Sequence, residues 1–185
     1  SRLGVRIVAH AIEIAGIKAA KCDYDFIEKN PVRCADPDVA PLMEEAILNA
    51  RGEKDSVGGI IQLEVYGLPP GLGDPIFGKL DARLCSAIMT IGAIKGVEVG
   101  DGFAITKLRG SQANDQMNKD GFLSNHHGGI LGGISSGAPV IMRVAVKPTA
   151  SIATKQSTIT VAGEPCEVEV KGRHDPCIVV RAVPV

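Results

Sequence analysis

The chain has 185 residues, of which 45% are hydrophobic and 22% charged, and its formal net charge is −1. This length allows one domain with a sizeable core, and so small a net charge argues against a nucleic-acid surface built on bulk positive charge. No apolar run reaches the length of a membrane-spanning helix and no signal peptide opens the sequence, so we expect neither a membrane nor nucleic acid as a partner. Five cysteines without a Cys-X-X-Cys pair indicate free thiols in a reducing cytoplasm.

The first half of the sequence predicts two strands and two helices. From the amino terminus we expect a buried strand over 5–17, an irregular segment over 18–38, a helix over 39–51, a charged turn over 51–59, a half-exposed strand over 60–66, a proline- and glycine-rich loop over 67–78 and a helix over 79–94. Asp38 is the expected cap of the first helix, whose apolar face would hold Leu42, Ile47 and Leu48. The second helix is indicated by Leu80, Leu84, Ile88 and Ile91 at helical spacing.

The second half predicts mostly strands and turns. We expect strands over 96–102, 103–108, 139–146 and 178–183, a polar mobile loop over 109–121, and a hairpin of 157–161 with 168–171. Strands outnumber helices and are joined by turns, so the sequence predicts an α+β fold with largely antiparallel sheet.

One stretch, Ser124–Gly137, is unusually rich in glycine; we call it the glycine segment. It contains the pairs Gly128-Gly129 and Gly132-Gly133, followed by Gly137. Glycine lets the backbone take positive φ and lie against another surface. The segment therefore fits either a backbone cradle for a ligand or a tight corner between packed strands.

Two further segments carry polar chemistry. Lys147–Ser151 places a lysine and two hydroxyls at a strand end, which suits a phosphate but also an ordinary strand terminus with a solvated lysine. Arg173, His174 and Asp175 stand together before an apolar run. Arg173 can bind an anion with two parallel hydrogen bonds and Asp175 can act as a base, although a surface turn with an ion pair explains the same residues. A zinc site would draw on His126, His127, His174 and Cys177, but no pair spacing supports one, and we expect no metal.

Six stretches, in the same order along the chain, closely resemble the chorismate synthase family. They lie at 52–59, 71–82, 100–112, 124–137, 146–151 and 172–184. The last reads Gly-Arg-His-Asp-Pro-Cys-Ile-Val-Val-Arg-Ala-Val-Pro, which resembles the family's C-terminal signature. The resemblance covers almost the whole chain.

The resemblance implies a fold and an activity. The family fold is a β-α-β sandwich in which helices are layered between antiparallel sheets, and the enzyme is a homotetramer. The reaction is the 1,4-elimination of phosphate from 5-enolpyruvylshikimate 3-phosphate, a small-molecule substrate, to give chorismate in the shikimate pathway. Reduced FMN is required although the reaction has no net redox change, and NADP is a further nucleotide associated with this enzyme.

The same resemblance implies the site residues. Lys147, Thr149 and Ser151 match the segment that holds the phosphate end of FMN, with Pro148 and Ala150 shaping its turn. Further flavin contacts match Ala93, Gly132 and Arg173, and Asp175 matches the acid near flavin N5 that is proposed to assist its deprotonation. Two positions depart from the family pattern, because Gly92 stands where Asn is usual and His127 where a small residue is usual.

Two N-terminal motifs of the family, with their histidines and arginines, are absent from this sequence, as is the terminal helix. We therefore expect 1–185 to be a single C-terminal-half fragment of the chorismate synthase domain that holds part of the FMN site and does not turn over alone. A non-enzymatic phosphate- or nucleotide-binding module and an oligomerisation module are the alternatives, and neither needs a catalytic acid.

Overall fold

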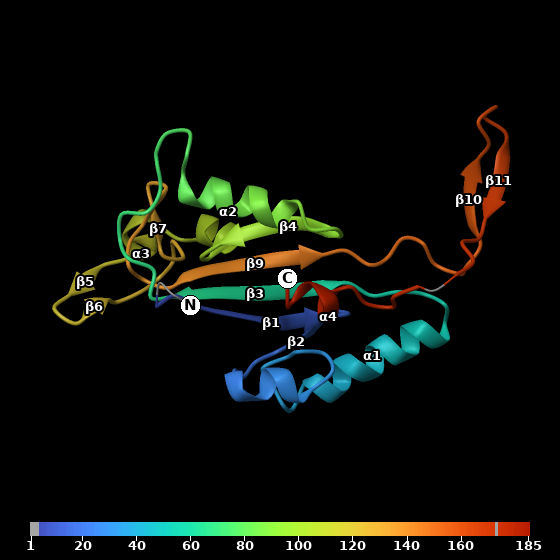
Figure 1. The fold of residues 1–185 in the computed structure, drawn as a ribbon, viewed down its shortest axis with the longest axis horizontal. Coiled ribbons are helices and arrows are strands. Elements are labelled where there is room, and N and C mark those ends of the chain that lie inside the picture. The colour runs from blue at the N-terminus through green and yellow to red at the C-terminus, as the bar shows by residue number, and fades with distance from the viewer. Residues whose placement is uncertain (1–3, 173) are drawn as a thin grey trace. The chain divides into compact units, whose positions relative to one another are not determined.

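The computed structural model describes residues 4–172 and 174–185 of the chain (Figure 1). Its main sheet has five strands in the order β2-β1-β3-β9-β4. The strands are β1 (Arg6–Ile14), β2 (Ile17–Lys18), β3 (Gly59–Tyr66), β4 (Ile94–Val99) and β9 (Val140–Val146). The β1–β2 pair is antiparallel, with Ile14 opposite Ile17. Strands β3 and β9 confirm, each to within one residue, the strands expected over 60–66 and 139–146.

The chain forms two compact units. The first consists of residues up to 10 together with 61–145, and the second of 11–60 together with 146–185. We call them the first and second unit. The strands β1, β3 and β9 each pass from one unit into the other.

The first unit is organised around an apolar cluster under helix α2 (Leu80–Met89). Ile130, Val140 and Met142 are buried, and the partly buried residues packed against them include Leu80, Leu84 and Ile88 of the helix. These three side chains recur every four residues, so the predicted apolar face of the helix is confirmed. The helix ends at Met89 rather than Ile94, before Gly92, a residue that disfavours helix.

The remaining elements of the first unit are short. They are η2 (Gly102–Lys107), α3 (Gly110–Ala113), β5 (Met117–Asn118), β6 (Gly121–Phe122), β7 (Ile130–Leu131) and β8 (Ile134–Ser135). The expected strand over 103–108 is wrong, because these residues form a 3₁₀ helix in which Phe103 is 80% exposed. The polar loop expected over 109–121 instead contains α3, β5 and the first residue of β6, which pairs antiparallel with β5.

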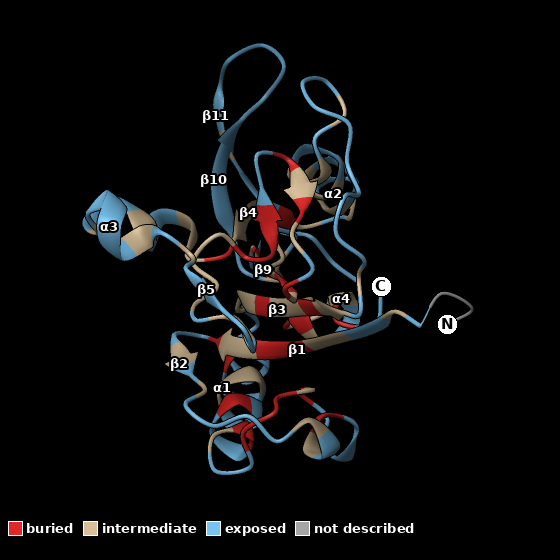
Figure 2. Cartoon of the chain, turned by 90° about the vertical axis from the view of Figure 1, so that its left-hand side faces the viewer, coloured by how far each residue is buried: buried red, intermediate tan, exposed pale blue. Residues whose placement is uncertain are grey.

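The second unit holds helix α1 (Ala40–Gly52), the 3₁₀ helix η1 (Tyr24–Lys29), strands β10 (Gln156–Ile159) and β11 (Pro165–Val168), and helix α4 (Val179–Ala182). A hairpin forms here as expected, but its second strand is 165–168 rather than 168–171. Figure 2 shows the hairpin as exposed, in contrast to the buried stretches of β1 and β3. The expected strand over 178–183 is wrong. Val179 and Val183 are both buried and four residues apart, which is helical spacing.

Helix α1 differs from the prediction in its cap and in its buried face. Its N-cap is Val39, without a side-chain hydrogen bond, so Asp38 does not cap it, although a proline lies in the first turn as expected. Met43 faces the core, whereas Leu42 and Leu48 are about half exposed. The small residues Ala40 and Ala50 complete the buried face and carry too little hydrophobicity to be recognised from the sequence.

Asp36 organises the irregular segment over 18–38. It is buried, and its carboxylate accepts hydrogen bonds from the amides of Ala20 and Lys21, both at 2.8 Å, and of Asp38 at 3.0 Å. These amides hold the pKa of Asp36 below its ordinary value, although burial alone would raise it. One buried carboxylate thus fixes a segment that has no hydrophobic period.

In strand β3 the expected exposed face carries a buried acid. Glu64 is 3% exposed, lies 3.4 Å from the Nε2 atom of His10, and accepts a hydrogen bond from Gln62 at 2.7 Å.

Within the described part of the chain, no helix has both the length and the apolar character needed to cross a bilayer.

Candidate functional site

The glycine segment folds into a tight hairpin. Strands β7 and β8 pair antiparallel, with Leu131 opposite Ile134, so their connection consists of only Gly132 and Gly133. The φ angles of these two residues are +59° and +87°, the positive values that a two-residue type I′ hairpin turn requires. A Cβ atom added to Gly132 would meet nothing within 4 Å. The turn is therefore open at Gly132, so a ligand could approach its backbone.

The other glycine pair serves packing. A Cβ atom on Gly128 would lie 2.8 Å from the carbonyl oxygen of Ile141, and one on Gly129 would lie 2.5 Å from that of Pro139. Both contacts are with backbone, which cannot move aside as a side chain can. The two alternatives for this segment thus apply to different glycines: a packing corner at 128–129 and an open turn at 132.

Two carboxylates fix the base of the hairpin. Asp101 accepts a hydrogen bond from Nδ1 of His126 at 2.6 Å, and its amide donates to the carbonyl oxygen of His126 at 2.8 Å. Asp115 accepts from the amides of His126 and His127 and from the hydroxyl of Ser124. Burial opposes ionisation of Asp115, but these donors hold its pKa below the ordinary value. Sequence reasoning missed both acids, whose partners lie 9 to 25 residues away.

Ala93 lies in the turn between α2 and β4, and its φ is +72°. This left-handed conformation is unfavourable for alanine by about 1–2 kcal/mol. Strained backbone of this kind often occurs at functional sites, and it motivates a hypothesis of function rather than proving one.

The segment Lys147–Ser151 follows directly after β9 and carries unused hydrogen-bond donors. Among the described residues, the backbone amides of Thr149, Ala150 and Ser151 have no acceptor. Ala150 and Ser151 are exposed, and within the described part of the chain the Nζ atom of Lys147 donates only to the carbonyl oxygen of Pro148, at 3.1 Å. Consecutive amides of this kind next to an ammonium group are suited to an anion. We call residues 147–151 the amide loop.

Hydrogen bonds connect the amide loop to Asp175 and to the turn before β3. The hydroxyl of Thr149 donates to the carbonyl oxygen of Asp175 at 2.9 Å, and the hydroxyl of Ser56 donates to that of Thr149 at 2.7 Å. The carboxylate of Asp175 pairs with Arg181 at 2.8 Å. Ser56 and Arg181 were not identified from the sequence, which gave no local signal for these contacts. Arg173 lies outside the described residues.

The expected site residues fall into both units. Ala93 and Gly132 belong to the first unit, whereas the amide loop and Asp175 belong to the second. The structure therefore brings Asp175 together with Thr149 inside one unit. No group of three or more His, Cys, Asp and Glu in the described ranges is arranged to hold a metal ion. His126 pairs instead with Asp101, and His174 with the carbonyl oxygen of Val170.

Comparisons with known proteins agree on one family. The family model described as chorismate synthase matches residues 1–185. The chorismate synthase of Chloroflexus aggregans is 50% identical over 188 residues, which cover 99% of this chain and 52% of that protein. For the enzyme of Methanothermobacter thermautotrophicus the identity is 48%, with 98% and 51% covered. A crystal structure of chorismate synthase matches with a TM-score of 0.73 and 29% identity, covering 81% of this chain and 51% of that one. The α and β architecture with antiparallel strands is thereby confirmed, and the chain spans about half the length of the curated relatives it matches.

Proposed function

Because the chain belongs to the chorismate synthase family, we propose that it takes part in the elimination of phosphate from 5-enolpyruvylshikimate 3-phosphate to give chorismate. This is a carbon–oxygen lyase reaction of the shikimate pathway, which leads to the aromatic amino acids. The full match to the family model is the observation that carries the proposal. We further propose that 1–185 is one piece of the family domain, that the enzyme is a homotetramer, and that it works in the cytoplasm.

Reduced FMN is the proposed cofactor, and the amide loop supports this proposal. When bound, the cofactor supplies transient electron density to the substrate without a net redox change. The free amides of Thr149, Ala150 and Ser151 and the exposed ammonium of Lys147 would hold its phosphate. Pro148 fixes φ at the start of the loop, and Arg173 would add a guanidinium from outside the described residues. The donors present thus fit the phosphate end of a flavin nucleotide.

Asp175 is the proposed acid–base residue of this site. Its carboxylate is only partly exposed and is held by Arg181, while Thr149 holds its backbone carbonyl. The ion pair restricts the side chain and the bond from Thr149 fixes the backbone that carries it, and a base must be oriented toward the proton it accepts. In the first unit, Ala93 and the open turn at Gly132 are the proposed backbone contacts to the flavin.

The test is an anaerobic titration of the purified chain with reduced FMN. We expect Lys147→Gln to weaken binding by about tenfold, since a charged hydrogen bond is worth about 1.5 kcal/mol or more. Lys29→Gln, in η1 of the same unit, removes the same charge from an exposed position and should leave binding unchanged. Equal affinities for Lys147→Gln and Lys29→Gln would contradict the proposed site.

A second measurement tests whether this chain alone produces chorismate. The chain covers about half the length of its relatives, so we propose that it contributes only part of the substrate site. Chorismate production should then be undetectable with the chain alone, substrate and reduced FMN. Turnover under these conditions would show that 185 residues suffice.

A further inference from the structure

The charged turn before β3 is a motif that the proposed function leaves without a role. It begins at Arg51, near the end of α1, and continues as Gly-Glu-Lys-Asp-Ser-Val-Gly-Gly over 52–59. We propose that this turn forms the cationic wall of a phosphate subsite, in a cavity that it shares with Ala153 and with residues around His174. The phosphate of FMN is already assigned to the amide loop, and no residue of that loop lines this cavity, so the group taken here is a separate, free phosphate. The inference rests on the proposed function only where that phosphate is the co-product of the elimination.

Hydrogen bonds tie the turn to the two segments on the other sides of the cavity. The hydroxyl of Thr154 donates to the carbonyl oxygen of Lys54 at 3.3 Å, and the amide of Val57 donates to that of Pro176 at 2.8 Å. Together with the bond from Ser56 to the amide loop, these contacts fix three segments that are far apart in the sequence. The cavity is therefore bounded by anchored backbone.

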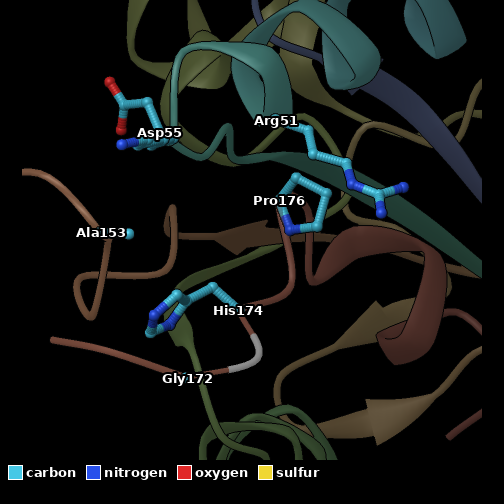
Figure 3. Close-up of a pocket in the computed structure, with 7 residues that line it drawn as sticks. Arg51, Asp55, Ala153, Gly172, His174 and Pro176 are labelled. Atoms are coloured by element: carbon cyan, nitrogen blue, oxygen red, sulfur yellow. The ribbon is translucent and has the colours of Figure 1, made fainter.

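The cavity has a volume of about 290 Å³. Sites for drug-sized ligands usually measure roughly 300–1,000 Å³, so the volume suits a small group and not a whole flavin nucleotide. In Figure 3 Asp55 and Arg51 lie on one side of it, His174 and Gly172 on the other, and Pro176 between them. A phosphate group with a few waters matches both the size and the polar lining.

The charges of the lining favour an anion. Arg51 and Lys54 line the cavity, and among the described residues neither forms an ion pair. The single carboxylate, Asp55, accepts a hydrogen bond from the amide of Ser56 at 2.7 Å, and in Figure 3 it points away from His174. Within the described residues, the lining thus contains two cations without an ion pair and one carboxylate that already accepts a hydrogen bond.

The conformation of Lys54 fixes where its side chain begins. Its φ is +60°, and the amides of Glu53, Lys54 and Asp55 all bond back to carbonyl oxygens in the last turns of α1. This is the left-handed arrangement that ends many helices and normally uses glycine. A lysine here places an ammonium group beside the cavity, and the returning amides satisfy carbonyl oxygens at the negative end of the helix.

His174 has one ring nitrogen engaged. Its Nε2 atom lies 2.8 Å from the carbonyl oxygen of Val170 and therefore carries the proton. The ring is held in place by this bond, and the proposal does not draw on its charge. The two permanent cations, Arg51 and Lys54, consequently carry the proposal.

The experiment measures phosphate and flavin binding by calorimetry and fluorescence. The ligands are inorganic phosphate, FMN and riboflavin, which lacks the phosphate. The double variant Arg51→Gln/Lys54→Gln is compared with the wild-type chain and with Lys29→Gln as the control. We expect the double variant to lose about tenfold or more in affinity for inorganic phosphate, with FMN and riboflavin binding unchanged. Arg51→Lys keeps the charge and should retain most of the affinity.

The outcomes distinguish the source of the phosphate. Loss of phosphate affinity alone supports a subsite for free phosphate, the co-product of the proposed elimination. Loss of FMN affinity, alone or together with that for phosphate, would place the cofactor's phosphate here and would overturn a separate subsite. Unchanged binding of both ligands overturns the subsite. Failure of every form of the chain to bind FMN counts against the proposed function instead, and the phosphate arm still decides the subsite. Lys54→Gln alone, at an exposed position, replaces the double variant if the latter does not fold.

Discussion

Gly58→Ala is the sharpest test of how the charged turn meets the amide loop. A Cβ atom at this position would lie 2.5 Å from the carbonyl oxygen of Val146 and 2.9 Å from Cδ of Pro148. Both neighbours belong to backbone or to a proline ring, so no rotamer change relieves the contact. Overpacking of this kind costs about 1–3 kcal/mol. Since 1 kcal/mol moves the Tm of a chain this size by about 2–4 °C, we expect Tm to fall by roughly 2–12 °C.

Gly52→Ala is the matched control. Gly52 ends α1, and a Cβ atom there would meet nothing within 4 Å. Alanine is favoured over glycine in a helix by up to about 1 kcal/mol, so this variant should be as stable as the wild type or more so. Thermal unfolding followed by circular dichroism separates the two. If Gly58→Ala unfolds at the same temperature as Gly52→Ala, the turn does not lie against the loop as described.

Three further predictions concern titration, thiols and backbone strain. The folded-state pKa of Asp36 lies below the unfolded value, so its contribution to stability is present above about pH 4 and is lost as the pH falls through the folded pKa. Asp36→Asn should therefore destabilise the chain at pH 7 and flatten its acid unfolding in urea titrations, and an unchanged acid profile would contradict this. Cys34 and Cys177 are buried, which raises the pKa of their thiols, whereas Cys22 is exposed. A thiol reagent should therefore modify Cys22 in the folded chain and modify Cys34 and Cys177 only after unfolding. Ala93→Gly relieves a positive φ and should be more stable than Ala87→Gly, in the interior of α2, by about 2–3 kcal/mol in denaturant unfolding.

The sequence predicted elements where hydrophobic period and turn residues agreed. Strands β3 and β9, the presence of helix α1 and the buried side of α2 followed from these two signals, whereas the buried face of α1 did not. The apolar runs at 103–108 and 178–183 were assigned wrongly although turn residues flank both, because periodicity alone does not distinguish a short apolar strand from a short helical segment. Their state is decided by packing: Val179 and Val183 are both buried, whereas Phe103 remains exposed.

The site could be predicted only where a single stretch of sequence contains it. The amide loop is contiguous, and the resemblance located it directly. The partners that hold it are not local, because Ser56 reaches the loop across 93 residues and Thr149 reaches Asp175 across 26. The turn at Gly132-Gly133 is the exception that the sequence could have revealed. Two glycines between short apolar stretches predict a hairpin. The many other glycines of the segment concealed this signal.

Gly132→Ala tests whether the open hairpin turn has a role beyond folding, and the chain supplies a matched control in Gly163. Both glycines lie in hairpin connections with positive φ, +59° and +86°, and a Cβ atom on either would meet nothing within 4 Å. Alanine at either position should therefore cost the same, about 1–2 kcal/mol of strain, measured by urea unfolding.

Flavin binding should separate the two variants. A backbone contact to the flavin at Gly132 does not involve the phosphate, so Gly132→Ala should weaken FMN and riboflavin alike, whereas Gly163→Ala should weaken neither. Lys147→Gln, by contrast, should reduce the affinity for FMN toward that for riboflavin. If Gly132→Ala and Gly163→Ala match in flavin affinity as they do in stability, the turn at Gly132 serves only to reverse the chain, and the flavin contacts of this chain lie in the second unit and at Ala93.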